Sequence, residues 1–272
     1  MSMNGSRMNS IIRFENVTLR YDAADVLQHI NLNIQEGEHT VILGPNGSGK
    51  STLIKLISCE LYPSISSMPH VREIMGQERW EVAQLRRNLG IVTNDLHNRF
   101  AFEGGHLSAL EAVISGFFGT LGIFDHQQIL PEYNDAAKAA MERVGIGDLA
   151  DKKLGEMSTG QLRRSLVARA LVHPVKAILL DEPTVGLDIK AQLEFVEMMR
   201  SLANSGTTVI LVTHHIEEVF EEIKTAVLIK EGTIYASGQK DEMLNSANLS
   251  EIFNTPLHVQ KQDNRYSIHP VT

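Results

Sequence analysis

The feature that most constrains this chain is a glycine-rich stretch, Gly44-Pro45-Asn46-Gly47-Ser48-Gly49-Lys50-Ser51, which fits the pattern G-x-x-x-x-G-K-[ST]. It follows an apolar run, His39–Leu43, that predicts a strand, and it precedes Ser51–Ser58, whose spacing predicts an amphipathic helix. Glycines let backbone N–H groups fold around phosphate oxygens, and the N-terminal end of a helix attracts the same anion. The pattern alone would arise by chance in about 1% of chains of this length, so its context predicts a nucleotide-binding loop.

The loop also predicts roles for individual side chains. We expect Lys50 to contact the β- and γ-phosphates of the nucleotide and the Ser51 hydroxyl to coordinate Mg²⁺. In the helix that follows, the apolar positions expected to be buried are Leu53, Ile54, Leu56 and Ile57. The residues expected to bind the nucleotide are Gly44, Pro45, Asn46, Gly47, Ser48, Gly49, Lys50, Ser51 and Thr52.

Two later apolar runs end in polar residues suited to nucleotide chemistry. Ala177–Leu180 leads into Asp181 and Glu182, and a strand buried to its carboxyl end delivers such acids to the crevice where α/β sheets bind ligands. We expect Asp181 to hold Mg²⁺, through water, and Glu182 to act as the general base on the attacking water. Acids often follow buried strands at a solvated surface, so this interpretation depends on the phosphate loop.

A second such run, Val209–Thr213, ends at His214, a candidate contact to the γ-phosphate. His215 is expected to point elsewhere if the strand continues, because successive side chains alternate along a strand.

Composition excludes several classes of protein. The 272 residues are 43% hydrophobic and 21% charged, which is ordinary for a soluble globular protein, and the net charge of −8 gives no reason to expect nucleic-acid binding. Cys59 is the only cysteine, so we expect a reducing compartment, no disulfide and a small buried thiol. The longest apolar stretch, Ala112–Phe124, is too short to span a membrane as a helix. Residues 1–10 are expected to form a disordered leader.

A second phosphate-binding element is predicted at Met157-Ser158-Thr159-Gly160-Gln161, which precedes the helical pattern Leu162–Leu171. The Ser158 hydroxyl, the Gly160 N–H and a helix N-terminus together form a second anion site. With this element in place, the chain from about Ile11 onward resembles the ABC (ATP-binding cassette) ATPase family, whose LSGGQ signature this segment is similar to. The resemblance implies a homodimer that encloses two ATP molecules, in which Ser158, Gly160 and Gln161 of one chain contact the γ-phosphate held by the other.

The resemblance implies further roles and a fold. Tyr21 stacks on adenine (an ordinary strand aromatic is the alternative), Asp188 in the D-loop-like Thr184–Asp188 reaches across the dimer, and His214 matches the switch histidine. The expected fold is an α/β P-loop core, mainly a parallel sheet with flanking helices, that carries an antiparallel β subdomain. A helical subdomain at about 95–160 is inserted into an ATPase domain at 11–240, and 241–272 form a short C-terminal extension.

Two residues depart from the family pattern. Asn94 stands after the predicted strand Leu89–Thr93 where the family has a metal-sensing glutamine, and Thr159 stands where glycine is usual in the signature. Neither change removes a charged catalytic group, so we expect an active but slow ATPase. The expected metal-binding set is Ser51, Asp181 and Asn94.

Two functions fit this resemblance. In the leading hypothesis the chain is the ATPase subunit of a membrane transporter, on the cytoplasmic face, and binds a permease near Asn94 and Phe100–Phe124. Within that region, Ile114–Phe124 is either the docking surface or a buried helix. The alternative is a soluble regulatory or repair-associated ATPase without a permease, because NDLHNRF and ISGFFGTLGIF are similar to molybdate-type and photorepair-associated cassettes. The signature excludes an unrelated P-loop kinase or GTPase.

Overall fold

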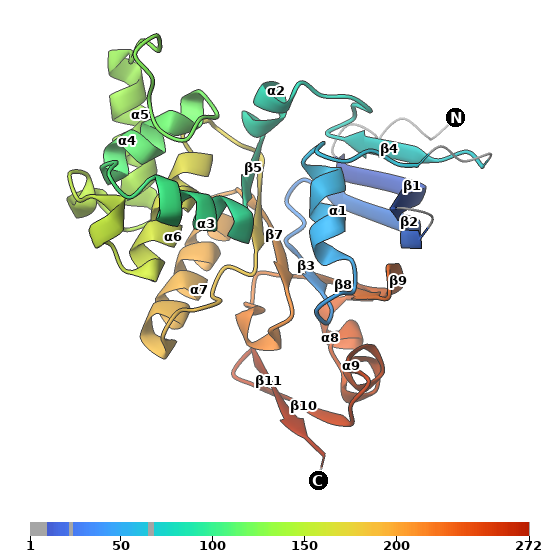
Figure 1. The fold of residues 1–272 in the computed structure, drawn as a ribbon. Coiled ribbons are helices and arrows are strands. Elements are labelled where there is room, and N and C mark those ends of the chain that lie inside the picture. The colour runs from blue at the N-terminus through green and yellow to red at the C-terminus, as the bar shows by residue number, and fades with distance from the viewer. Residues whose placement is uncertain (1–9, 22–23, 65–67, 272) are drawn as a thin grey trace. The chain divides into compact units, whose positions relative to one another are not determined.

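The computed structural model describes residues 10–21, 24–64 and 68–271, which form two compact units (Figure 1). The first unit combines residues 1–82 with 208–272, and the second consists of residues 83–207. Of the expected leader, residues 1–9 lie outside the described residues, whereas Ser10 begins the first strand.

An antiparallel sheet of three strands opens the first unit. Its strands are β1 (Ser10–Tyr21), β2 (Ala24–Gln35) and β4 (Val71–Ile74), in the order β2-β1-β4. The alternation of buried side chains shifts phase between Phe14 and Val17, where the pairing with β2 also shifts and Asn16 adopts a φ of 52°. A β-bulge therefore keeps the apolar residues on one face on both sides of the shift.

A second sheet in the same unit carries the phosphate loop. Its order is β7 (Thr208–Thr213), β3 (Thr40–Leu43), β8 (Thr225–Lys230) and β9 (Thr233–Gln239); the first three are parallel, and β9 is antiparallel to β8. Every residue of β3 and β7 is buried, as expected of parallel strands that are covered on both faces. Helix α1 (Lys50–Ile57) follows β3, and Leu53, Ile54, Leu56 and Ile57 are buried as predicted.

The residues after β9 fold into a small module rather than an irregular tail. Two helices, α8 (Lys240–Met243) and α9 (Ser246–Phe253), precede a hairpin of β10 (Leu257–Gln262) and β11 (Arg265–Pro270). Asp263 and Asn264 both have positive φ, the conformation of a tight hairpin turn. Tyr266 of β11 is buried and donates a hydrogen bond to Asp241 of α8, which fastens the hairpin to the helix.

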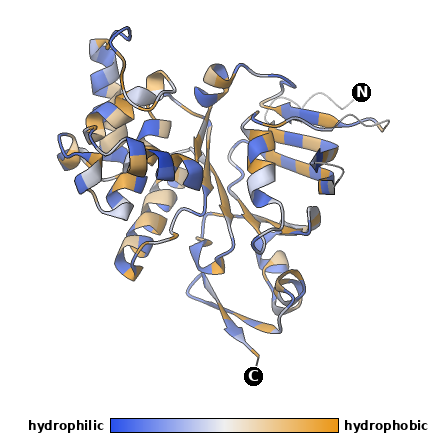
Figure 2. Cartoon of the chain, in the orientation of Figure 1, coloured by the Kyte–Doolittle hydropathy of each residue, from blue (hydrophilic) through white to orange (hydrophobic). Residues whose placement is uncertain are grey.

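The second unit is mainly helical and contains one parallel pair of strands, β5 (Leu89–Val92) and β6 (Ala177–Asp181). The helical pattern predicted for Leu162–Leu171 corresponds to α6. Its helices are α2 (Val82–Arg86, which begins at the unit boundary), α3 (Asn94–Glu103), α4 (Ala109–Ile114), η1 (Ser115–Phe117), α5 (Pro131–Arg143), η2 (Gly147–Leu149), η3 (Leu154–Glu156), α6 (Thr159–Ala170) and α7 (Ile189–Asn204). Figure 2 shows mainly apolar colour along the central strands and mixed colour on the helices and on β1 and β2, as buried strands and amphipathic elements require. The α/β fold class predicted from the sequence is confirmed.

The segment Ile114–Phe124 is not one buried helix. Helix α4 ends at Ile114, and after η1 the chain turns at Gly119 and Gly122, both with positive φ. Phe117 stacks on Tyr133 with ring centroids 4.1 Å apart, whereas Phe124 at the far end is 50% exposed. Among the described residues, no helix combines the length and apolar character needed to cross a membrane.

The packing of α7 gives a first prediction. Phe195 is fully buried on this helix, so Phe195→Ala should leave a cavity and cost about 3–5 kcal/mol of unfolding free energy. Leu193 on the same helix is largely exposed, and Leu193→Ala should cost less than about 1 kcal/mol. The measurement is urea unfolding followed by circular dichroism. Equal midpoints for the two variants would contradict this account of the core.

Candidate nucleotide site

The phosphate loop of the first unit has a backbone that only glycine permits at several points. Gly47 and Gly49 have φ values of 78° and 104°, in the left-handed region. A Cβ at Gly44 would overlap the carbonyl oxygen of Ile229, so this position has no room for a side chain. Helix α1 begins at Lys50 without a side-chain cap, which leaves its first N–H groups to an anion.

Two side chains of the loop are buried polar groups. The Lys50 ammonium donates hydrogen bonds to the carbonyl oxygens of Gly44 at 2.7 Å and Pro45 at 3.0 Å, and the residue is only 5% exposed. The Ser48 hydroxyl is buried and has no hydrogen-bond partner within the described ranges. Because a buried polar group without a partner is costly, the loop fits a ligand that supplies oxygen acceptors, such as a nucleotide phosphate.

The turn between β8 and β9 supports this loop, although no sequence motif indicates it. The Gly232 N–H donates to the Ser48 carbonyl at 2.9 Å, and the Gly232 carbonyl accepts from the Gln28 N–H at 2.8 Å. Glu231 and Gly232 both have positive φ, which is typical of a two-residue hairpin turn. A cavity of about 210 Å³ separates this turn and the end of α9 from residues 45–48.

Two further predicted residues of the first unit lie outside the phosphate loop and α1, namely Tyr21 and His214. Tyr21 is the last residue of β1 and is 51% exposed, so its ring is accessible to a ligand. His214 follows the end of β7, and its ring lies against that of His215, with centroids 3.9 Å apart. Because the strand ends at Thr213, the alternation that would have turned His215 away does not apply.

The acid pair of the second unit lies at the end of β6, as predicted. Asp181 is the last residue of the strand, and Glu182 adopts a φ of 45°, an uncommon conformation for a residue other than glycine. Such backbone conformations are often found at functional sites, where the surrounding contacts maintain them. Here Arg163 of α6 donates to the Glu182 carbonyl at 2.5 Å.

The same arginine reaches Asn94. Arg163 is buried, and its second guanidinium nitrogen donates to the Asn94 side-chain oxygen at 3.3 Å. Asn94 is the first residue of α3, whose N-cap Thr93 accepts from the Leu96 N–H at 3.2 Å. Arg163 therefore connects Glu182 and Asn94, and its role was not predicted because nothing in the local sequence distinguishes it from Arg164.

The signature segment forms the N-terminus of α6. The Ser158 hydroxyl accepts from the Gln161 N–H, and the Gln161 side-chain oxygen accepts from the Ser158 N–H, each at 3.2 Å. This is a capping box, and the Ser158 hydroxyl keeps its own proton for donation to a phosphate. Thr159 is exposed, and the space around Gly160 is open, with the Ala191 Cβ the nearest atom to an added Cβ at 3.6 Å.

Asp188 forms the N-cap of α7, and its carboxylate accepts from the Ala191 N–H at 2.8 Å.

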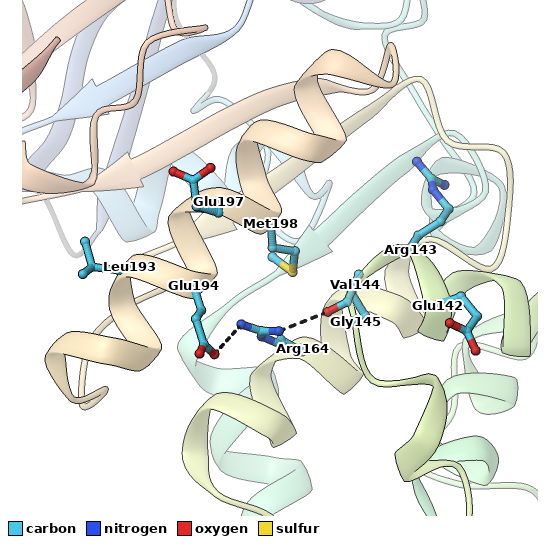
Figure 3. Close-up of a pocket in the computed structure, with 9 residues that line it drawn as sticks. All are labelled: Glu142, Arg143, Val144, Gly145, Arg164, Leu193, Glu194, Glu197 and Met198. Atoms are coloured by element: carbon cyan, nitrogen blue, oxygen red, sulfur yellow. Dashed lines mark hydrogen bonds and ion pairs between the residues drawn. The ribbon is translucent and has the colours of Figure 1, made fainter. Parts of the chain in front are cut away.

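A separate cavity of about 490 Å³ lies among α5, α6 and α7. Beside it, Arg164 donates hydrogen bonds to the Glu194 carboxylate and to the Val144 carbonyl (Figure 3). None of the predicted site residues lines this cavity.

Comparison with known proteins identifies the family. Residues 27–185 match the ABC transporter family, which is more than half of the chain. The chain belongs to this family. It is 31% identical to the uncharacterized ABC transporter ATP-binding protein YlmA of Bacillus subtilis, over 92% of this chain and 93% of that protein. It is also 31% identical to the hemin import ATP-binding protein HmuV of Hahella chejuensis, with 91% of each chain covered.

Solved structures of ABC proteins have the same fold. CbiO1 from Clostridium perfringens, part of the ABC transporter complex CbiONQ, is 29% identical with a TM-score of 0.74, over 90% of this chain and 95% of that one. The cassette MJ0796, solved as a dimer with ADP and Pi, is 27% identical with a TM-score of 0.68, over 84% and 98%.

This ABC protein is therefore an ATP-binding subunit that uses ATP and Mg²⁺ and hydrolyses ATP in a reaction coupled to transport. The leading hypothesis from the sequence is confirmed at this level, and nothing among these relatives favours the regulatory or repair-associated alternative.

The crowding at Gly44 gives a second prediction. Gly44→Ala places a methyl group against the Ile229 carbonyl, so the loop must move, and ATP affinity should fall by at least about tenfold. Gly105→Ala is the control, because its Cβ would meet only ordinary contacts and Gly105 is not among the predicted nucleotide-binding residues. Binding of a fluorescent ATP analogue to each purified variant measures the effect. Unchanged affinity in Gly44→Ala would contradict the assigned loop geometry.

Proposed function

We propose that residues 44–52 bind the phosphates of ATP, with Lys50 on the β- and γ-phosphates and Tyr21 stacked on adenine. The observation that carries this proposal is the loop itself, with its glycine-dependent backbone, buried Lys50 and buried Ser48 hydroxyl. A triphosphate supplies oxygen acceptors for the Ser48 hydroxyl and the N-terminus of α1, and negative charge beside the Lys50 ammonium.

Hydrolysis is assigned to polar residues at the ends of the buried strands. Glu182 orients and deprotonates the attacking water, and Arg163 fixes the direction of that side chain by holding the Glu182 carbonyl. His214 contacts the γ-phosphate. Ser51, Asp181 and Asn94 hold Mg²⁺, which when bound neutralises charge on the phosphates.

The complete site requires a second copy of the chain. Ser158, Gly160 and Gln161 of one copy contact the γ-phosphate bound by the other, and Asp188 reaches across the interface. The capping box supports this role, because it fixes the N-terminus of α6 while leaving the Ser158 proton available. The dimeric MJ0796 structure supports a homodimer of the same kind.

The homodimer drives a membrane permease from the cytoplasmic face. CbiO1 in its transporter complex and the import protein HmuV support this assignment. The ATPase domain covers residues 11–240, with the helical subdomain at about 95–160 as the part that binds the permease and 241–272 as a C-terminal extension. Exposed Phe102 and Phe124 provide apolar contacts in that subdomain.

Glu182→Gln tests the general base. This variant keeps the shape of the side chain but cannot accept a proton, so ATP turnover should fall by at least about 100-fold while ATP binding persists and the dimer accumulates. Phosphate release and light scattering after gel filtration measure the two effects. Glu194→Gln, at an exposed acid of α7, should hydrolyse ATP normally. Full turnover in Glu182→Gln would remove this residue from the mechanism.

Asn94→Gln tests the departure from the family pattern. The longer side chain should bring the amide closer to the metal and water, and kcat should rise with little change in ATP affinity. The control is Asn98→Gln, because Asn98 is exposed on the same helix. If kcat falls instead, the hydrogen bond from Arg163 to Asn94 matters more than the reach of the amide.

A further inference from the structure

One group of cations in the second unit has no carboxylate partner. Arg169 of α6 is only 8% exposed, and its guanidinium donates to the Ser115 hydroxyl at 3.2 Å and the Thr120 carbonyl at 3.0 Å. Its third neighbour is the Phe100 ring, whose centroid is 5.2 Å from the guanidinium carbon. All three groups are neutral, so the charge of this buried arginine is not compensated by them.

Further arginines surround this buried charge. Burial, together with smaller contributions from repulsion by Arg86 and Arg99, lowers the pKa of Arg169 to about 10. Arg86 also lies beside Gly119, with a guanidinium nitrogen 3.6 Å from where a Cβ would be. Burial likewise lowers the pKa of His173, and the neighbouring Arg87 adds to this lowering.

The exposed members of the cluster are also without ion pairs. In the part of the chain that the structure describes, Arg86, Arg87 and Arg99 form none, although Asp95 and Glu103 lie one turn on either side of Arg99 in α3. Other arginines of the unit do form ion pairs, such as Arg164 with Glu194 at 3.1 Å and Arg200 with Glu197 at 3.2 Å. The cluster therefore keeps like charges close together at a cost in stability.

An exposed aromatic ring adjoins these charges. Phe102 is 87% exposed and lies three residues after Arg99, so the two side chains project from the same side of α3. Arginine and aromatic residues are both enriched at protein interfaces relative to the rest of the protein surface.

We propose that Arg86, Arg87, Arg99 and Phe102 form a docking surface for an acidic segment of the transporter's membrane subunit, which places an apolar residue against Phe102. This inference rests on the proposed function, and it adds the charge of the partner. Arginine guanidinium groups bind carboxylates through paired hydrogen bonds, and an acidic segment would also offset the repulsion around Arg169.

Charge favours a protein partner over a lipid surface. Clusters that bind anionic lipids have about 4–8 lysines or arginines. The proposed surface has fewer, namely Arg86, Arg87 and Arg99. The chain as a whole carries a net charge of −8, which opposes its approach to an anionic membrane.

The arrangement has a consequence that a purely structural role would not have. Neutralising the exposed arginines should stabilise the isolated chain while weakening its association with the membrane subunit. We therefore compare the double variant Arg86→Gln/Arg99→Gln with Lys138→Gln, which removes one exposed cation of α5 for which no ion pair is present in the described residues. The double variant should raise Tm by about 2 °C or more and leave the ATPase rate of the free protein unchanged.

Binding is measured by recovering polytopic membrane proteins from detergent-solubilised native membranes with tagged full-length protein. The wild type and Lys138→Gln should recover the same membrane subunit, and the double variant should recover it with about tenfold lower affinity, as expected for two surface charge pairs. If the wild type recovers no membrane protein, the proposed function fails. If the wild type and the double variant recover it equally, only the docking inference fails.

A second measurement identifies the chemistry of the partner. Arg99→Lys, made in the otherwise wild-type chain, keeps the positive charge and should still bind the membrane subunit. A carbodiimide should then join the new amine to an aspartate or glutamate of the membrane subunit, and mass spectrometry locates the cross-link. Cross-links to the chain's own acids alone would overturn the inference. Loss of binding to phosphatidylglycerol vesicles in the double variant, with membrane-subunit recovery unchanged, would assign the surface to lipid instead.

Discussion

The hydrogen bond from the Gly232 N–H to the Ser48 carbonyl fixes the part of the chain on which ATP binding depends. A phosphate-binding loop works only if its N–H groups face inward, and an isolated glycine-rich segment has too much conformational freedom to hold that arrangement. The turn between β8 and β9 supplies the restraint, and the Ile229 carbonyl next to Gly44 limits the loop on its other side. The residues that shape the site therefore lie nearly two hundred positions from the motif that reveals it.

The features that could be predicted from the sequence involve residues close together in the chain, and the features that were missed involve residues far apart in it. Strand β3, the phosphate loop and helix α1 are adjacent in the chain, and their apolar pattern and glycines are local signals. The capping box at Ser158 is local for the same reason. The hydrogen bonds of Arg163 to Glu182 and Asn94 span 19 and 69 positions, and no periodicity in the sequence indicates them.

Two segments were predicted from the sequence only in outline, for physical reasons. The residues after 240 were predicted as a short C-terminal extension without named elements, because α9 is a short helix and the hairpin strands are largely polar. Their order depends on the contact between Tyr266 and Asp241, which joins elements that look unrelated in the sequence. In Ile114–Phe124 the apolar composition suggested either a buried helix or a docking surface. The positive φ values of Gly119 and Gly122 contradict a single buried helix, whereas docking at the exposed end, Phe124, stays a prediction.

Helix α6 brings the separate functions of the second unit onto one rigid element. Its N-terminus carries the signature residue Ser158, its first turns carry Arg163 at the Glu182 backbone, and its last turn carries Arg169 beneath the arginine cluster. A helix of this length extends about 18 Å and transmits a displacement at one end to the other with little bending. Because Arg163 and Arg169 are both buried and hydrogen-bonded to groups outside the helix, α6 cannot shift without changing the contacts of Glu182 and Ser115. A partner that moves the docking end of α6 would therefore also act on the signature and on the backbone of the proposed general base.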